Sequence, residues 1–254
     1  MLNLELQAIY VMWLRQMKRF IRSKSRLVVT IIQPLLFLFI LGSGFRTIAL
    51  PGLAGVDYIL FFAPGIITMA IVFSSMFTGI SVLWDKQFGF LQEVLVAPIS
   101  RLSIIIGRTL GGASVALVQG FVILAITILL GTPISSFLGV LLTLVFMMLI
   151  AFTAVGLGLI FASKMNDFQS FPLIMNLVMM PLLFLSSAFF PVADNPLLLT
   201  IARFDPLFYM VDGLRGSLIG TANILPPLVN LLVVLLLCIT MLGIGSYSFS
   251  KSEA

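Results

Sequence analysis

The sequence contains no histidine and a single cysteine, Cys238. Without histidine the chain lacks the usual general base and the commonest metal ligand. One thiol can form neither an internal disulfide nor a cysteine zinc site, so we predict no metal site. The phosphate-binding pattern G-x-x-x-x-G-K-[ST] is also absent. We therefore predict that the chain has no catalytic residues, binds no cofactor and cannot hydrolyse ATP by itself.

Charged residues are scarce as well: they make up 9% of the chain, whereas hydrophobic residues make up 61%. Soluble domains contain about 25% charged residues, so this composition indicates a polytopic membrane protein. The net charge of +5 could suggest a nucleic-acid partner. However, six of the fourteen basic residues lie between Arg15 and Arg26, directly before the first apolar run. That placement is typical of a cytoplasmic membrane anchor, and we predict no binding to nucleic acid.

A helix that crosses a membrane needs about 20 mostly apolar residues. The run from Thr109 to Ser163 carries no charge and is long enough for two spans, and the turn-forming stretch GTPISS at 131–136 divides it. The expected fold class is an all-α integral membrane protein in which residues 1–254 form one transmembrane domain. We predict six spans, at roughly 27–45, 58–84, 104–130, 137–163, 168–190 and 226–249.

The basic residues outside and at the ends of these spans predict the orientation. If the N-terminus is cytoplasmic, the outer segments carry only three basic residues, Arg46, Arg203 and Arg215, and the inner segments carry eleven. Positive charge is enriched on the cytoplasmic side of membrane proteins. We therefore predict a multi-pass protein of the cytoplasmic (inner) membrane with both termini in the cytoplasm.

Residues 4–22 have the periodicity of an amphipathic helix. One face is basic and suits a helix that lies in the cytoplasmic lipid interface. The helix could serve as a membrane anchor, as a docking surface for a soluble partner, or as both. The apolar face contains Leu6, Ile9, Tyr10, Trp13, Met17, Phe20 and Ile21, and the basic face contains Arg15, Lys18, Arg19 and Arg22.

The polar stretch DKQFGFLQEVLVAPISR at 85–101 lies between the second and third predicted spans, on the cytoplasmic side. Leu91, Val94 and Leu95 share one helical face. Pro98 disfavours helical geometry in the preceding residue, and Ser100 suits the N-cap of the helix that follows. The pattern predicts a short helix with an apolar face. Such a helix could dock into a partner, or the segment could be only a connector.

Residues 190–225, on the outer side, are too apolar for a free loop and too interrupted for a span. Asp205-Pro206 predicts the start of a helix that continues through Tyr209. Asp212 and Arg215 are three residues apart on it and could form an ion pair. A helix that enters the membrane part-way must bury its ends against protein or reach water. This segment could be a lid over the spans or a gate over a substrate route.

Two amides lie within predicted spans: Gln33 and Asn176. Polar groups inside a membrane are often functional, so both are candidates for lining a substrate path. They could equally form hydrogen bonds between neighbouring helices. Gly107 and Gly111 form a G-x-x-x-G pattern, which permits close helix approach, although twenty glycines in the chain reduce its diagnostic value.

Three features resemble a known family. FGFLQEVLVAPISR is similar to a cytoplasmic motif that usually reads E-x-G-T-L-E-x-L-L-V-T-P-I-S-R, and DPLFYMVDGLRG is similar to N-P-L-T-Y-x-V-D-x-L-R. An amphipathic N-terminus before six spans is the third feature. Together they resemble the permease subunits of type-2 ABC exporters, which include daunorubicin-resistance-like and polysaccharide-export permeases. The departures are Phe90 in place of Thr, an acidic register shifted by one at Glu93, and Asp205 in place of Asn.

The resemblance implies a homodimer in contact with membrane lipid and with two separate ABC ATPase subunits, which use ATP and Mg. It implies export of a lipid-like substrate, an amphiphilic drug or a glycolipid. It also implies that the segment around 85–98 is the coupling helix that receives the movement of the ATPase. The expected coupling residues are Phe88, Gly89, Leu91, Glu93, Val94, Leu95, Pro98 and Arg101.

The main alternative is a secondary transporter driven by an ion or proton gradient. Such transporters usually place an ionisable coupling residue within their spans, and the interiors of the predicted spans contain none. A membrane enzyme is a weaker alternative because the chain has no histidine and no intramembrane pair of acids.

Overall fold

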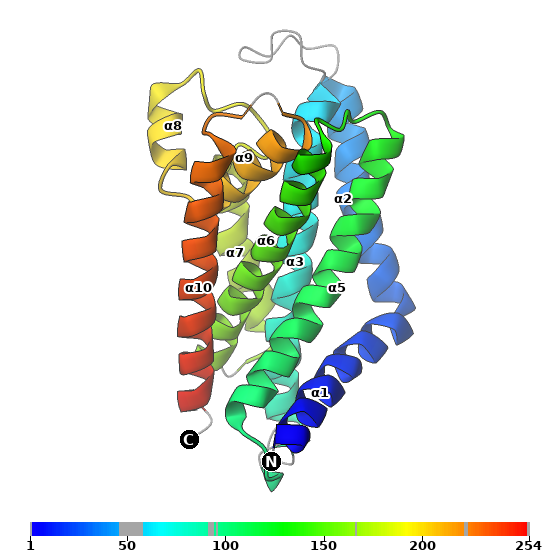
Figure 1. Cartoon of the computed structure of the whole chain (residues 1–254), viewed down its shortest axis with the longest axis vertical. Helices are drawn as coiled ribbons and strands as arrows, with labels where there is room; N and C mark the ends of the chain where they lie inside the picture. The colour runs from blue at the N-terminus through cyan, green and yellow to red at the C-terminus, as the bar shows by residue number, and fades with distance from the viewer. Residues whose placement is uncertain are drawn as a thin grey trace.

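The computed structural model describes residues 2–45, 58–90, 94, 96–165, 167–220 and 223–252. Every regular element within these residues is a helix (Figure 1). Five of the described helices are long and apolar enough to cross a membrane: α2 (Lys24–Phe45), α3 (Tyr58–Gln87), α5 (Arg101–Leu129), α6 (Phe137–Lys164) and α10 (Pro227–Ser252). The other four are α1 (Leu2–Arg22), α7 (Ser170–Leu185), α8 (Pro196–Ala202) and α9 (Pro206–Leu218). The chain is an all-helical, multi-pass membrane protein, as the composition predicts.

Several helix boundaries coincide with the predicted capping residues. The Ser100 hydroxyl accepts a hydrogen bond from the Ser103 N–H at 3.2 Å and caps α5. The Asp205 carboxylate accepts one from the Leu207 N–H at 2.8 Å, and Pro206 is the first residue of α9. The turn at 131–136 separates α5 from α6, and Gly131 adopts a φ of 98° there. These local signals confirm the predicted starts of α5 and α9.

Helix α3 lies at the centre of the bundle, where it packs against α2, α5 and α6 (Figure 1). Its apolar window is 83% buried, whereas the windows of α2 and α10 are only 17% and 22% buried. A Cβ atom at Gly79 would lie 2.6 Å from the Gly158 carbonyl oxygen, so glycine permits the close contact of α3 with α6. The exposed faces of α2 and α10 remain available to lipid or to another chain.

Helix α1 packs along α5 at one end of the bundle (Figure 1). The G-x-x-x-G pattern makes this contact possible. A Cβ at Gly107 would lie 2.7 Å from the Ile9 carbonyl oxygen, and one at Gly111 would lie 2.7 Å from the Gln16 Cβ. The apolar face of α1 is therefore divided: Phe20 is buried in protein, whereas Tyr10 is 57% exposed.

Helix α7 is shorter than the fifth predicted span, 168–190. It has 16 residues, which correspond to a length of about 24 Å, whereas the hydrocarbon core of a bilayer is about 30 Å thick. The helix ends at Leu185, and Ser187 adopts a φ of 63°, in the left-handed region that non-glycine residues rarely occupy. The chain turns there toward α8 and α9, at the end of the bundle opposite to both termini (Figure 1).

Candidate functional site

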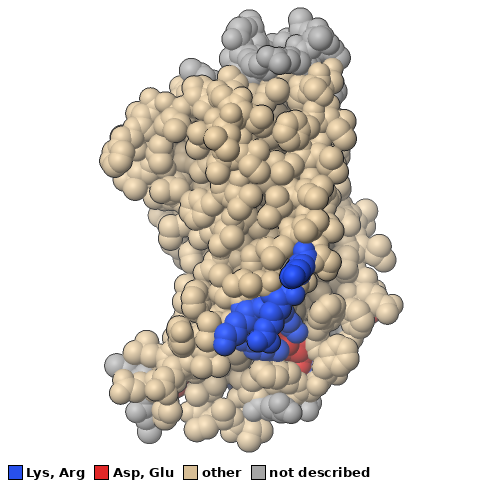
Figure 2. Space-filling model, turned by 90° about the vertical axis from the view of Figure 1, so that its right-hand side faces the viewer, with Lys and Arg blue, Asp and Glu red and all other residues tan. Residues whose placement is uncertain are grey.

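Basic side chains gather in one patch at the end of the bundle where α1 lies, with an acidic group beside them (Figure 2). At this end of the bundle three arginines surround Asp85, near the end of α3. Arg15 of α1 forms two hydrogen bonds with its carboxylate, at 2.8 and 2.6 Å. Arg108 of α5 lies 3.0 Å from the same carboxylate, and Arg19 lies 3.8 Å from it. We call these four residues the Asp85 cluster.

The Asp85 cluster joins three helices through one carboxylate. Asp85 and Arg108 are each only 2% exposed. Bidentate arginine–carboxylate pairs are among the stronger hydrogen-bonded contacts in proteins, and removing one partner of a buried pair leaves an uncompensated charge. The cluster therefore fixes α1 against α3 and α5 at the point where the segment 85–101 begins.

Sequence reasoning missed this cluster. It placed Arg15, Lys18, Arg19 and Arg22 together on a basic face turned away from the apolar side. In the structure Arg15 and Arg19 contact Asp85, whereas Lys18 and Arg22 are exposed. One signal in the sequence could have found it: Asp85 directly follows the long uncharged run 58–84. If that end of the helix is buried, its carboxylate needs a cation nearby.

The predicted coupling segment leaves α3 next to the Asp85 cluster. Gly89 has a φ of 77°, which ends the helical path of α3. The Arg15 guanidinium lies 3.6 Å from the centre of the Phe90 ring, so the same arginine contacts Asp85 and the beginning of the segment. Phe88 is 77% exposed.

The middle of this segment is only partly described. Val94 and Val96 have helical backbone conformations, and Val96 is 86% exposed. The chain bends at Pro98, as predicted. Leu91, Glu93 and Leu95 lie outside the described residues, so their roles in coupling stay predictions.

The far end of the segment is also held by neighbouring helices. The Glu5 carboxylate of α1 accepts hydrogen bonds from the Ser100 N–H at 3.0 Å and from the Ser100 hydroxyl at 2.9 Å. Hydrogen bonds from Ser103 and Ser100 lower the pKa of Glu5. Arg101 donates a hydrogen bond to the Ser250 carbonyl of α10 at 2.9 Å. Both ends of the predicted coupling segment are therefore attached to the helical bundle.

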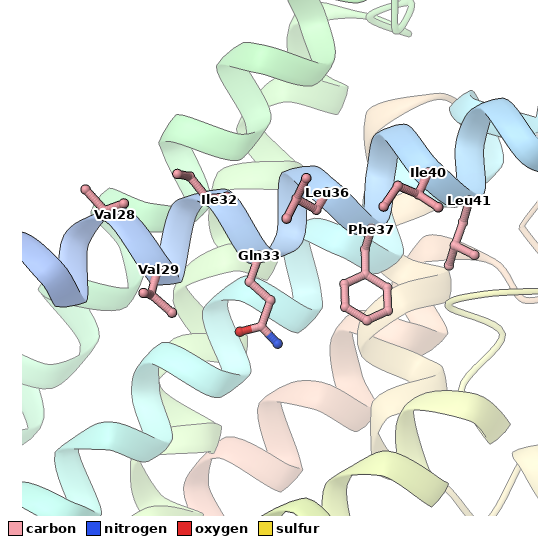
Figure 3. Close-up of a pocket in the computed structure, with 8 residues that line it drawn as sticks. All are labelled: Val28, Val29, Ile32, Gln33, Leu36, Phe37, Ile40 and Leu41. Atoms are coloured by element: carbon pink, nitrogen blue, oxygen red, sulfur yellow. The ribbon is translucent and has the colours of Figure 1, made fainter.

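The two intramembrane amides predicted from the sequence line one cavity of about 190 Å³ between α2, α3, α5 and α7. Figure 3 shows Gln33 extending from α2 toward α3. Gln119 of α5, which sequence reasoning did not single out, donates a hydrogen bond to the Thr30 hydroxyl at 2.7 Å. None of the lining residues that the structure describes is charged. We call this space the polar cavity; its lining residues are Thr30, Gln33, Pro34, Met69, Ala70, Phe73, Ser74, Phe77, Gln119, Asn176 and Met180.

At the opposite end, α9 is buried over most of its length. The spacing of Asp212 and Arg215 would allow an ion pair, but among the described residues their hydrogen bonds go to other groups. The Asp212 carboxylate accepts hydrogen bonds from the Ile224 and Leu225 N–H groups and from Asn230, at 2.7 to 2.9 Å. These bonds hold the chain that leads into α10.

Arg215 binds in the other direction, toward α3 and the end of α7. It donates hydrogen bonds to the Phe61 carbonyl at 3.2 Å and the Ser187 carbonyl at 2.7 Å, and its guanidinium lies 3.8 Å from the centre of the Phe61 ring. Tyr209 donates a hydrogen bond to the Arg203 carbonyl at 2.9 Å. Spacing along the helix did not decide the partners of Asp212 and Arg215. Both side chains form hydrogen bonds with backbone groups from other parts of the chain instead.

Residues 7–219 match the family model described as ABC-2 type transporter. The chain belongs to the ABC-2 type transporter permease family. The match includes the Asp85 cluster, the polar cavity and helices α8 and α9. Proteins of this family are non-catalytic membrane subunits, and membership implies association with ABC ATPase subunits.

The permease is similar to several curated proteins along most of its length. It is 26% identical to the inner membrane transport permease YadH of Escherichia coli K12, covering 94% of this chain and 93% of YadH. It is 27% identical to the transport permease ycf38 of Cyanophora paradoxa, covering 83% and 73%. It is 28% identical to nodulation protein J of Rhizobium leguminosarum bv. trifolii, covering 74% and 72%.

Proposed function

We propose that the permease is the membrane-spanning subunit of an ATP-driven exporter in the cytoplasmic membrane. It moves a lipid-like substrate, an amphiphilic drug or a glycolipid outward, and separate ABC ATPase subunits supply the energy. The observation that carries this proposal is the attachment of the segment 85–101 to the bundle at both ends. Arg15 contacts both Asp85 and Phe90, and Glu5 binds Ser100. A displacement of the segment is therefore transmitted directly to α1, α3 and α5.

The working unit in this proposal is a homodimer with two ATPase subunits, each using ATP and Mg. The coupling helix contacts the ATPase through Leu91, Val94 and Leu95, with Glu93 beside them. Truncating a well-buried interface anchor often costs 2 kcal/mol or more, whereas charges at the rim cost far less. The apolar residues therefore contribute most of the binding, and Glu93 contributes less.

The proposed topology has six spans and cytoplasmic termini. Helix α7 is the fifth span, shortened because the chain turns at Ser187, and α8 and α9 return into the outer end of the bundle. Two features of α9 support this arrangement: its burial and the hydrogen bonds of Asp212 and Arg215. They satisfy the requirement that polar groups at membrane depth be bonded to protein.

This function predicts that ATP hydrolysis requires a second polypeptide. The purified permease, reconstituted alone in liposomes, should hydrolyse no ATP above the background of empty liposomes, because its sequence has no nucleotide-binding motif. Adding its partner ABC ATPase should give vanadate-sensitive hydrolysis that amphiphilic substrates stimulate. Sustained hydrolysis by the permease alone, lost when the permease is omitted, would contradict the proposal.

A further inference from the structure

Asp205 is a buried acid in the turn between α8 and α9, outside the five helices that are long enough to span a membrane. Both helices lie at the end of the bundle opposite to the two termini (Figure 1). The side chain is only 2% exposed. One carboxylate oxygen accepts the capping hydrogen bond from the Leu207 N–H, whereas the buried Oδ2 has no hydrogen-bond partner among the described residues. Half of this carboxylate is therefore removed from water with nothing to replace it.

No cation compensates the charge of this carboxylate in the described part of the chain. The Leu207 N–H is its hydrogen-bond donor, and no side chain forms an ion pair with it. Arg203 is close in sequence but exposed, and the other nearby groups bind elsewhere. The charged and titratable side chains on the surrounding elements are Tyr58, Asp194, Arg203, Tyr209, Asp212 and Arg215.

A desolvated carboxyl group without a cation favours its neutral form. Burial raises the pKa of Asp205 to about 7, although the hydrogen bond from the Leu207 N–H acts in the opposite direction. The protonated acid still offers a carbonyl oxygen to that N–H. It leaves only a neutral hydroxyl unpaired, which costs far less free energy than a buried charge.

We propose that Asp205 is a proton-sensitive cap that controls how firmly α8 and α9 are held at the outer end of the bundle. When the carboxyl is protonated, the neutral side chain stays buried and caps α9. When it is ionised, the buried charge favours states in which the turn opens and the carboxylate reaches water. The packing that then loosens is the small apolar cluster of Val192, Ala202 and Phe208, which come from both sides of the turn.

The direction of the pH effect follows from the two protonation equilibria of Asp205. In an opened outer region the carboxyl titrates near its ordinary pKa, about 3.9, whereas in the closed region its pKa is about 7. The closed region therefore binds the proton more tightly. Its local stability is highest in acid, falls as the pH rises from about 4 toward 7, and changes little above that range.

Hydrogen–deuterium exchange of the full-length permease in nanodiscs tests the proposal. The reference is Asp205→Asn, because asparagine keeps the acceptor oxygen of the cap and cannot titrate. Comparing wild type with this variant at the same pH cancels the chemical dependence of exchange on pH. For peptides that cover residues 204–214, we expect the ratio of the wild-type rate to the variant rate to rise roughly tenfold or more between pH 5 and pH 8.

Two further variants keep the result specific to the cap. Asp205→Ser supplies a second neutral cap, so the ratio of wild type to this variant should rise in the same way. The matched control is Asp194→Asn, at an exposed aspartate before α8, which should follow wild type at every pH. A ratio to both neutral-cap variants that stays constant from pH 5 to pH 8 would overturn the proposal. Loss of the pH dependence in Asp194→Asn would instead assign the effect to that residue and overturn it as well.

These measurements need neither ATP nor the ATPase subunit. A constant ratio would remove the proton-sensitive cap and leave ATPase-dependent export standing. The proposed topology decides only that the proton comes from the outer solution.

Discussion

Replacing Asp85 with asparagine should destabilise the permease by about 3 kcal/mol, because the substitution removes the buried carboxylate that pairs with both Arg15 and Arg108. Asparagine keeps the size of the side chain and can still form a hydrogen bond with Arg15, so the effect isolates the charge. A loss of this size corresponds to a decrease of roughly 5–10 °C in the unfolding temperature. We expect α1 to separate from α3 and α5 before the rest of the bundle unfolds.

Intrinsic fluorescence can follow this change, because Trp84 contacts Arg19 of the cluster and Trp13 lies on α1 where it packs on α5. Trp84 precedes Asp85, and Trp13 donates a hydrogen bond to the Ser114 hydroxyl at 3.0 Å, from α1 to α5. Asp85→Asn should shift tryptophan emission to longer wavelength at temperatures where the wild type is unchanged. The matched control is Asp194→Asn, at an exposed aspartate between α7 and α8. Emission and unfolding temperature equal to wild type in Asp85→Asn would show that the cluster contributes no stability.

Replacing Arg215 with methionine should open the turn that follows α7. The substitution keeps a long apolar side chain but removes the hydrogen bonds to the Phe61 and Ser187 carbonyls. Hydrogen bonds to charged groups each contribute about 1.5–3 kcal/mol, and Ser187 has the left-handed backbone conformation that needs support from its surroundings. We expect the region from α7 to α9 to open locally much more often while the rest of the bundle stays folded.

Thiol labelling measures this opening directly. In a Cys238→Ser background, Ser186→Cys places the only thiol of the chain at a fully buried position beside the turn. Arg215→Met should increase its rate of modification by maleimide roughly 10- to 30-fold, as a loss of about 2 kcal/mol in local stability implies. Arg203→Met, at an exposed arginine between α8 and α9, should leave the rate unchanged. A rate equal to the parent in Arg215→Met would mean that the arginine does not hold the turn.

The sequence predicted the features that depend on local chemistry. Ser100 and Asp205 cap helices because a short polar side chain before an apolar run satisfies free N–H groups. The low charge content predicted the membrane environment, and the cytoplasmic and outer motifs predicted the family. The spacing of Gly107 and Gly111 indicated that a helix could approach closely there, but it did not identify α1 as that helix.

What the sequence did not predict depends on residues far apart in the chain. Arg15, Asp85 and Arg108 meet only after three helices pack, and no periodicity within one helix connects them. The sequence analysis did not select Gln119, which lies in a long uncharged run. In the structure it lines the same cavity as Gln33 and Asn176. Both groups of residues are products of tertiary packing.

The central claim is that ATPase movement reaches the membrane helices through the segment 85–101, and Leu91→Asp tests it most directly. The permease and its ATPase would be reconstituted together, and ATPase binding and amphiphile-stimulated ATP hydrolysis would be measured. Val96→Ala, at an exposed residue on the other side of the predicted helix, is the control and should behave as wild type. We predict that Leu91→Asp inserts normally but weakens ATPase binding at least about tenfold, as expected for an interface anchor, and abolishes stimulated hydrolysis. Wild-type binding and stimulation in Leu91→Asp would contradict the account and reduce the segment to a connector.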